Sequence, residues 1–406
     1  NDLLSGIINV TIRLYNSTGI YNETTGSGFQ LLQNSTGAAD GTYTFNATAV
    51  DNYGNVNDTA TRTVTVDTSI PLISFSNGTF DNNANRSADA VYVNVSVTEG
   101  SEDTIIFRIY NSTGLWNQTN YTSSVRNYNF TGLIDGTYTY NVAVNDTAGN
   151  SNSTETRTVT LDTIPPNVSF VGDTDTNGDN VTRNWISVQV NGVDERETGS
   201  ITIRLYNSSG IVNTSVNNSE NFFINFTGLD NGEYTFNATI NDTAGNGNET
   251  GTRTVSVDTT NPELSYGVNT EGDFANKSQN WVYVNVSATE SNLINITFLL
   301  KNASGFVNRT AYTTLVKNIN FTGLADGTYT YNVTMYDVAG NINRTALRTI
   351  ELDTTYPTVD YGNQTEVNKS TVSRDWIIVN ISSTESGSGI DNITIYVYNN
   401  STVIIN

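Results

Sequence analysis

One internal repeat governs how this chain can fold, because the same ordered markers return about every 95 residues. The first marker is a turn of the form Asp/Asn-Gly-x-Tyr, and it begins at Asp40, Asp135, Asn231 and Asp326. The second marker, Asp-Thr-x-x-Pro, begins at Asp67, Asp162, Asp258 and Asp353. Proline ends strand pairing and stiffens a short linker, so the second marker is expected to set the domain boundaries.

Within each copy of the repeat, apolar and polar residues alternate, as they do in strands that bury one face. Val282, Val284, Val286 and Ala288 share one parity, whereas the residues between them share the other. No helical periodicity competes with this pattern, and turns separate about seven strands per copy. The sequence therefore predicts an all-β fold of tandem seven-stranded β-sandwiches in an extended array.

The markers divide the chain into three complete copies, at residues 69–163, 164–259 and 260–354, and two partial ones. Residues 1–68 lack the first strands of a copy, and residues 355–406 lack the last strands. Incomplete sandwiches expose unpaired edges, so we expect either a piece of a longer chain or subunits that complete each other head to tail by strand donation. Contacts of the second kind would build filaments.

Two motifs give the copies a resemblance to a known family. Residues 133–138 (Leu-Ile-Asp-Gly-Thr-Tyr), with copies that begin at Leu229 and Leu324, are similar to a tyrosine corner, in which a Tyr hydroxyl bonds back to the backbone. Residues 145–150 and 157–163 resemble the Asp-x-Ala-Gly-Asn to Asp-Thr-x-x-Pro signature of microbial surface repeats. Each copy thus resembles the tandem bacterial and archaeal Ig-like, or fibronectin type III-like, modules of cell-surface proteins. The resemblance covers the whole chain and implies immunoglobulin-like sandwiches outside the cell.

Tryptophan departs from the fibronectin type III pattern, because it stands at the start of the second strand of a copy. It occupies positions 185, 281 and 376, and Ala90 replaces it in one copy. Its parity is that of the polar face. Either a strand-start bulge tucks the indole into the core, or the indole points outward as a contact residue for a neighbouring domain or subunit.

Composition excludes several classes of function. The chain has no Cys and no His, so it lacks thiolate metal sites and the side chain that enzymes use most often as an acid or base. Its formal net charge of -22 disfavours nucleic acid, whose phosphates bind Lys and Arg. No apolar run is long enough to span a membrane. We therefore predict an extracellular chain that is no enzyme and binds no nucleic acid.

Nearly forty positions begin an Asn-x-Ser/Thr sequon, which is more than this composition would produce by chance. The excess predicts N-linked glycans. Several acceptors have the outward parity of strands or lie in turns, and the predicted set is Asn16, Asn111, Asn207, Asn225, Asn237, Asn285, Asn302, Asn320 and Asn380. The alternative is that Asn and Thr simply suit turns and solvent-facing strand positions.

Acidic residues are expected to meet where one copy joins the next, because the loops at one pole of a sandwich lie beside the linker. The predicted sets are Asp67, Glu99 and Asp146; Asp162, Glu195 and Asp242; Asp258, Glu290 and Asp337; and, in the last copy, Asp353 and Glu385. Carboxylates gathered in this way repel one another, and their hard oxygen atoms suit Ca²⁺. The alternatives are a solvated acidic rim or pairing with Arg62, Arg157, Arg253 and Arg348.

The sequence thus predicts a structural extracellular protein, namely a glycosylated stalk, fibre or surface-layer component. Its partners would be copies of itself or neighbouring repeats, and its cofactors would be Ca²⁺ and N-linked glycans. A Cys-free chain dense in sequons suggests an archaeal surface. One alternative is an adhesin that binds a glycan or protein through exposed aromatic residues such as Trp116 and Tyr121, and another is the strand-donating filament subunit.

Overall fold

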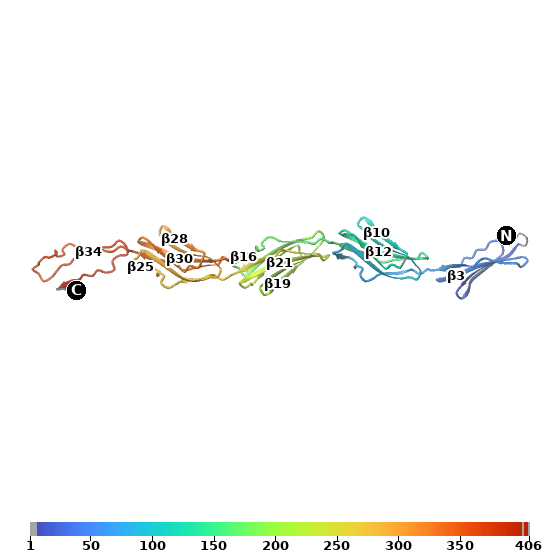
Figure 1. Ribbon diagram of the computed structural model, residues 1–406, viewed down its shortest axis with the longest axis horizontal. Helices are drawn as coiled ribbons and strands as arrows, with labels where there is room; N and C mark the ends of the chain where they lie inside the picture. The colour runs from blue at the N-terminus through green and yellow to red at the C-terminus, as the bar shows by residue number, and fades with distance from the viewer. Residues whose placement is uncertain (1–5, 123, 400–401, 405–406) are drawn as a thin grey trace. The chain divides into compact units, whose positions relative to one another are not determined.

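The computed structural model describes residues 6–122, 124–399 and 402–404. This described part consists of β-strands and turns (Figure 1). It contains no helix with the length and apolarity that a membrane crossing would require. The contacts divide the chain into two compact units. One unit comprises Asn1–Val168, Gly192–Ile201 and Ile240–Asn248, and the other comprises Ser169–Asn191, Thr202–Thr239 and Glu249–Asn406.

The strands begin and end close to the turns that the sequence marks. The first fourteen are β1 (Ile7–Asn16), β2 (Gly19–Gly26), β3 (Gly41–Asp51), β4 (Val56–Asp58), β5 (Arg62–Val66), β6 (Leu72–Phe75), β7 (Ala84–Arg86), β8 (Ala90–Thr98), β9 (Glu102–Asn111), β10 (Gly114–Tyr121), β11 (Asn127–Thr131), β12 (Gly136–Asp146), β13 (Ser151–Ser153) and β14 (Arg157–Leu161).

The next nine are β15 (Asn167–Phe170), β16 (Asp179–Val181), β17 (Trp185–Val193), β18 (Thr198–Asn207), β19 (Gly210–Asn217), β20 (Asn221–Thr227), β21 (Gly232–Asp242), β22 (Gly247–Glu249) and β23 (Arg253–Val257). The remaining strands are β24 (Glu263–Tyr266), β25 (Ala275–Lys277), β26 (Trp281–Thr289), β27 (Leu293–Asn302), β28 (Gly305–Tyr312), β29 (Asn318–Thr322), β30 (Gly327–Asp337), β31 (Ile342–Arg344), β32 (Arg348–Leu352), β33 (Thr358–Tyr361), β34 (Ile381–Thr384), β35 (Val397–Asn399) and β36 (Thr402–Ile404).

Each complete copy pairs its strands into one small and one large sheet. In residues 72–161 the small sheet has the order β11-β8-β6, and the large sheet has the order β10-β9-β12-β14-β7, with β13 on β12. Residues 263–352 repeat this arrangement as β24-β26-β29 and β25-β32-β30-β27-β28, with β31 on β30. Within the large sheets the short strands β7, β16 and β25 pair in parallel with β14, β23 and β32, respectively.

The apolar parity of the strands forms the core between the two sheets. We number the copies along the chain and count the partial one at residues 1–68 as the first. Phe107 of β9 and Val142 of β12 are fully buried in the second copy, beside Val93 of β8. In the fourth copy the predicted inward residues Val282 and Val284 lie in the equivalent cluster with Phe298. Burying a side chain of this size contributes about 1.5–3 kcal/mol. The predicted all-β fold of tandem sandwiches is therefore confirmed, and the copy at residues 72–161 adds the three-residue strands β7 and β13 to the seven that were expected.

The tyrosine corner that the sequence predicts is present. The Tyr138 hydroxyl donates to the carbonyl oxygen of Ile134 at 2.9 Å. The equivalent bonds are Tyr43 to Ala39 at 2.9 Å, Tyr234 to Asp230 at 3.0 Å and Tyr329 to Ala325 at 2.9 Å. A buried phenol finds an acceptor in this way without giving up the packing of its ring.

The two repeat markers contact each other in every copy. The Asp135 carboxylate accepts from the Thr163 backbone N–H at 3.1 Å and from its hydroxyl at 3.1 Å. The same backbone contact joins Asp40 to Thr68 at 2.9 Å, Asn231 to Thr259 at 3.0 Å and Asp326 to Thr354 at 3.0 Å. Hydrogen bonds from Ser69 and Thr68 hold the pKa of Asp40 below its ordinary value. Hydrogen bonds from Thr354 and Thr355 do the same for Asp326. The start of each long strand is thus tied to the linker that follows the copy.

Trp185 and Trp281 lie on the outward face of β17 and β26, whereas Trp376, also expected at the start of a strand, lies outside the strands, between β33 and β34. Trp185 pairs with Thr227 and Trp281 pairs with Thr322, and neither ladder contains a register shift. Both indoles are partly exposed. The Arg183 guanidinium lies 4.1 Å from the centre of the Trp185 ring, a cation–π contact. These two indoles therefore point outward without a strand-start bulge, and their role as contacts for a neighbouring domain or subunit stays a prediction.

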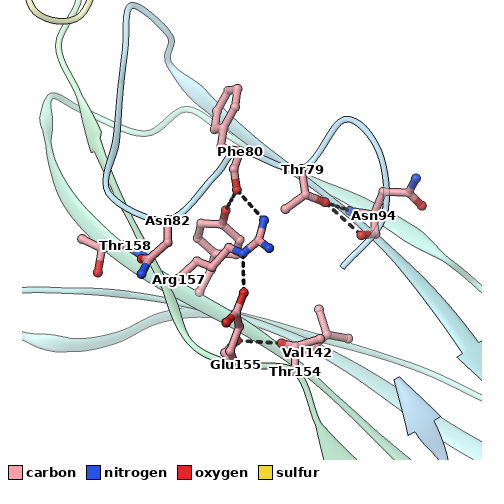
Figure 2. Close-up of polar contacts among 10 residues, drawn as sticks. Thr79, Phe80, Asn82, Asn94, Val142, Thr154, Glu155, Arg157 and Thr158 are labelled. Carbon is pink, nitrogen blue, oxygen red and sulfur yellow. Dashed lines mark hydrogen bonds and ion pairs between the residues drawn. The ribbon is translucent and has the colours of Figure 1, made fainter. Parts of the chain in front are cut away.

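Figure 2 shows how Arg157 is held in the second copy. Its Nη1 donates to the carbonyl oxygen of Phe80 at 3.0 Å, and the hydroxyl of Tyr140 donates to the same oxygen at 2.6 Å. The guanidinium stacks over the Phe75 ring at 4.5 Å, and its Nε donates to Glu155 at 2.8 Å. Burial raises the pKa of Tyr140 to about 12, so the phenol stays a donor at any ordinary pH.

Candidate functional site

The candidate site is built on the turn Asp-x-Ala-Gly-Asn that follows the longest strand of each copy. In the second copy, Asp146 is buried, and one carboxylate oxygen accepts the backbone N–H groups of Ala148 at 2.9 Å and Asn150 at 2.8 Å. The other oxygen accepts the Asn150 side-chain amide at 2.7 Å. Burial alone would raise the pKa of Asp146, but these donors outweigh it and the pKa lies below its ordinary value.

The asparagine that ends this turn also holds the linker. The Asn150 side-chain amide donates to the carbonyl oxygen of Asp67 at 3.0 Å, and two residues later the Asn152 amide donates to the carbonyl oxygen of Pro71 at 2.8 Å. We call this pair of contacts the asparagine clamp. The equivalent bonds are Asn246 to Asp162 at 2.8 Å, Asn248 to Pro166 at 3.0 Å, Asn341 to Asp258 at 2.7 Å and Asn343 to Pro262 at 2.8 Å.

A further contact belongs to the junction after the second copy. The Ser87 backbone N–H donates to the carbonyl oxygen of Ala244 at 3.2 Å, and the Ser87 hydroxyl contacts the Asn246 side chain. Asn85 donates to the Thr243 hydroxyl at 3.0 Å. The turn of the third copy is therefore bonded both to the linker and to the loop after β7.

The structure gathers one predicted carboxylate set in full and a second with one member exchanged. Asp67, Glu99 and Asp146 each offer an oxygen atom within 4.8 Å of the others. In the next junction the group consists of Asp162, Asp194 and Asp242. Asp194 thus takes the place predicted for Glu195, which is exposed. Asp194 begins a turn by accepting from the backbone N–H groups of Arg196 and Glu197, and this turn carries the next residue away from the cluster.

The third set does not gather to the same degree, because Asp258, Glu290 and Asp337 form no group within that distance among the described residues. Asp258 and Glu290 instead line an open cavity of about 680 Å³. In the last copy, Asp353 accepts the backbone N–H of Ser388 at 2.8 Å and its hydroxyl at 2.7 Å. These hydrogen bonds lower the pKa of Asp353, and Glu385 accepts the Gly387 N–H at 3.0 Å.

Burial and neighbouring negative charges both act on Asp162. Burial raises its pKa, the Ile164 backbone N–H lowers it, and the charges of Asp194 and Asp242 raise it again, so the pKa lies above its ordinary value. No ion pair of the described residues includes a member of the two carboxylate groups. The guanidinium groups of Arg157, Arg253 and Arg348 are instead bonded to carbonyl oxygens, those of Phe80, Asp175 and Glu271. Three oxygen donors this close suit a hard divalent cation such as Ca²⁺.

The predicted glycan acceptors lie in different settings. Asn16, Asn111, Asn207 and Asn302 end the first strand of a hairpin. Asn225 and Asn320 are exposed on β20 and β29, whereas Asn237 of β21 is half-buried and its Oδ1 has no hydrogen-bond partner. Asn285 is half-buried on β26, and Asn380 immediately precedes β34.

Two packed sheets, a tyrosine corner and repeated linkers define the chain as a series of immunoglobulin-like β-sandwiches. The sequence model of the bacterial Ig-like domain matches residues 2–68, 98–163 and 173–259, which together exceed half of the chain. The chain belongs to this family, and the resemblance found in the sequence is confirmed. No curated protein matches it significantly.

Several solved structures resemble the chain at low identity. The tetra-tandem repeat in the extending region of a large adhesion protein is 20% identical, with coverage of 87% of this chain and 94% of that chain and a TM-score of 0.37. Fibronectin(III)-like modules of CbhA from Clostridium thermocellum are 14% identical, covering 46% and 93% of the two chains, with a TM-score of 0.28. Three fibronectin domains of chicken CNTN1 are 11% identical, covering 67% and 95%, with a TM-score of 0.29.

Proposed function

We propose that the chain is a structural segment of a cell-surface protein, in which each Ig-like repeat adds length and a stiffened junction. One observation carries this proposal: the asparagine clamp occurs at three successive linkers with the same donors and acceptors. A receptor or an enzyme concentrates its specific chemistry in one site. Here the polar chemistry is repeated with the domain, which is typical of a protein whose task is mechanical.

A catalytic role finds no support in the residues of the site. The chain contains neither His nor Cys, and the most buried carboxylates, such as those of Asp146 and Asp337, are occupied by donors of their own turn. A carboxylate that accepts hydrogen bonds from its own turn is poorly placed to accept a proton from a substrate. The proposal is therefore that this segment is not an enzyme.

Localisation tests the proposed role. An antibody raised against residues 69–354 is expected to label intact cells, and protease treatment of intact cells is expected to release fragments of the repeats. Labelling that requires cell permeabilisation would contradict the surface role. The adhesin alternative rests on Trp116 of β10, which is 40% exposed. Tyr121, also expected to be exposed, instead packs against the rings of Phe107 and Tyr128. Loss of cell attachment in a W116A strain with unchanged surface labelling would favour the adhesin over the purely structural role.

We also propose that Ca²⁺ binds the two carboxylate groups and stiffens their junctions. Asp67, Glu99 and Asp146 would supply three oxygen ligands of the six to eight that Ca²⁺ takes, and Asp162, Asp194 and Asp242 would supply three at the next junction. What supports this is the proximity of three carboxylates without an arginine or lysine partner. Burial, and after it the charges of Asp194 and Asp242, raise the pKa of Asp162, and a bound divalent cation would offset the effect of these charges.

The variant Asp162→Asn distinguishes the destabilising repulsion between carboxylates from the stabilising effect of bound Ca²⁺. In chelator at pH 7 it is expected to be more stable than the wild type by about 1 kcal/mol, because two unit charges 4 Å apart near a surface repel by roughly 4 kcal/mol. The folded-state pKa of Asp162 is raised, so the wild type loses stability as pH rises through that pKa. The advantage of the variant should therefore disappear below about pH 4, where the carboxyl is protonated in the folded and unfolded states.

Calcium reverses the order of stability in this prediction. A ligand present at a hundredfold excess over its Kd stabilises the folded state by about 2.7 kcal/mol. Thermal unfolding with Ca²⁺ is expected to show a larger gain in the wild type than in the variant, which keeps only the group of Asp67, Glu99 and Asp146. The exposed Asp173→Asn serves as a control of equal charge change. Equal Ca²⁺ responses in all three proteins would overturn the calcium proposal.

Finally, we propose that the chain carries N-linked glycans. The excess of sequons and the exposure of many acceptor asparagines support this proposal. A glycan on an exposed asparagine would extend into solvent and cover sheet edges. A cysteine-free chain of this kind suits an archaeal cell surface.

A further inference from the structure

The sequons of the β-hairpins keep their acceptor amide free. Each has the form Asn-x-Ser/Thr-Gly and begins at Asn16, Asn111, Asn207 or Asn302. In every one, the Asn Oδ1 accepts the backbone N–H two residues later at 2.9 Å. At Asn111 the Thr113 hydroxyl donates to the same Oδ1 at 2.7 Å. The Nδ2 atoms make no hydrogen bond among the described residues, and the side chains are partly exposed at Asn16 and Asn111 and exposed at Asn207 and Asn302.

A second group of sequons belongs to the asparagine clamp. These sequons begin at Asn152, Asn248 and Asn343, and the Nδ2 of each donates to the carbonyl oxygen of a linker proline. Their threonines, Thr154, Thr250 and Thr345, are buried. Each hydroxyl accepts a strand N–H, from Val142 at 3.0 Å, Ala238 at 2.9 Å and Val333 at 2.9 Å. Both groups that define a sequon are therefore engaged in the fold (Figure 2 shows the Thr154 contacts).

A third group lies on β8 and β26 and immediately before β34, and we call its members the second-strand sequons. The Nδ2 atoms of Asn94, Asn285 and Asn380 donate to the carbonyl oxygens of Asn77 at 2.9 Å, Val268 at 2.9 Å and Asn363 at 2.8 Å. At Asn285 the amide also lies against the Gly267 backbone, where even an added Cβ would come within 2.8 Å of Nδ2. A sugar on this nitrogen would have to displace the turn. Asn285 and Asn380, which parity predicts as acceptors, fall into this group.

We propose that glycans are attached at the hairpin sequons and that the clamp and second-strand sequons stay bare. Attachment joins Nδ2 to the anomeric carbon of an activated glycosyl phosphate donor, breaks the bond between that carbon and the phosphate oxygen, and releases one amide proton to a base. This inference rests on the proposed glycosylation. The exposed Asn225 and Asn320 meet the same criterion as the hairpins, because their Nδ2 atoms make no hydrogen bond in the described structure. The clamp sequons thus serve the junction, and their resemblance to acceptors is incidental.

Glycopeptide mass spectrometry on the chain isolated from its native surface tests the assignment. Glycan is expected on peptides that contain Asn111, Asn207 and Asn302, and unmodified Asn is expected at positions 152, 248 and 343. Glycan on the clamp asparagines, or bare hairpins beside glycan at Asn94, Asn285 or Asn380, would overturn the assignment and leave glycosylation itself intact. Bare asparagine at every sequon would remove both this inference and the proposed glycosylation, while the structural role would stand.

Two matched variants give an independent readout. Asn207→Gln is expected to lower the intact mass by one glycan, with unchanged hydrogen exchange at the linkers. Asn343→Gln is expected to leave the mass of attached glycan unchanged and to speed amide exchange of residues 258–262 roughly tenfold, since one clamp hydrogen bond is misplaced. A loss of glycan mass in Asn343→Gln, or its absence in Asn207→Gln, contradicts the assignment.

Discussion

The variant Phe298→Ala is expected to destabilise the fourth copy by about 3–5 kcal/mol. The ring is fully buried between the two sheets, beside Val284 and Tyr331, and lies edge-on to Tyr312 with centroids 6.2 Å apart. Truncation leaves a cavity that well-packed strands cannot close. Hydrogen exchange measured by mass spectrometry on the whole chain should show lost protection in residues 281–352.

The matched control for this experiment is Phe306→Ala in the same copy. Phe306 is 66% exposed and contacts Lys301 through its ring, 4.5 Å from Nζ. Its loss is expected to change stability by no more than about 0.5–1 kcal/mol. Similar losses of protection in both variants would show that the ring of Phe298 is not part of a tightly packed core.

The second large effect is expected from Asp337→Ala, at about 2–4 kcal/mol. Asp337 is fully buried, and it accepts the backbone N–H groups of Gly340 and Asn341 at 2.8 Å each and the Asn341 side-chain amide at 2.8 Å. Alanine leaves these donors unsatisfied. Because the Asn341 amide also holds the carbonyl of Asp258, exchange at the linker is expected to accelerate together with exchange at the turn.

Asp337→Asn is the matched comparison for that variant. Its Oδ1 can still accept the two backbone N–H groups, but its amide nitrogen faces the amide of Asn341 and one contact is lost. A loss of stability about half as large is expected, measured by thermal unfolding of the whole chain. Equal stability of the alanine variant and the wild type would show that the turn does not depend on its carboxylate.

Much of the fold follows from the sequence, because every second residue of a strand with one buried face is apolar. Val282 and Val284 are buried as their parity predicts, and Tyr138 makes the corner bond that its motif predicts. The tryptophans also follow parity, since Trp185 enters its ladder without a bulge. The local sequence pattern is therefore sufficient to predict which side chains are buried wherever burial alternates along a strand.

The candidate site is less predictable, because its contacts join residues more than 80 positions apart. Asn152 reads as a sequon, and nothing local to it shows that its amide meets Pro71. Adjacent acids raise a similar difficulty: Asp194 and Glu195 stand on one loop, and only the turn made by Asp194 decides which of them joins Asp162. The signal that could have found the clamp is the fixed spacing of two asparagines, four and six residues after the buried aspartate, in every copy.

The parallel pairing of β7 with β14 determines how a copy responds to tension. One of these strands lies near the start of the copy and the other at its end, and their register runs from Val159 opposite Ala84 to Leu161 opposite Arg86. A pull on the two ends of the chain slides parallel partners past each other, so all the hydrogen bonds between them carry load together. Antiparallel partners pulled from one end would instead separate one bond at a time. The same geometry recurs in β16–β23 and β25–β32, so we expect each complete copy to resist force by shear between these two short strands.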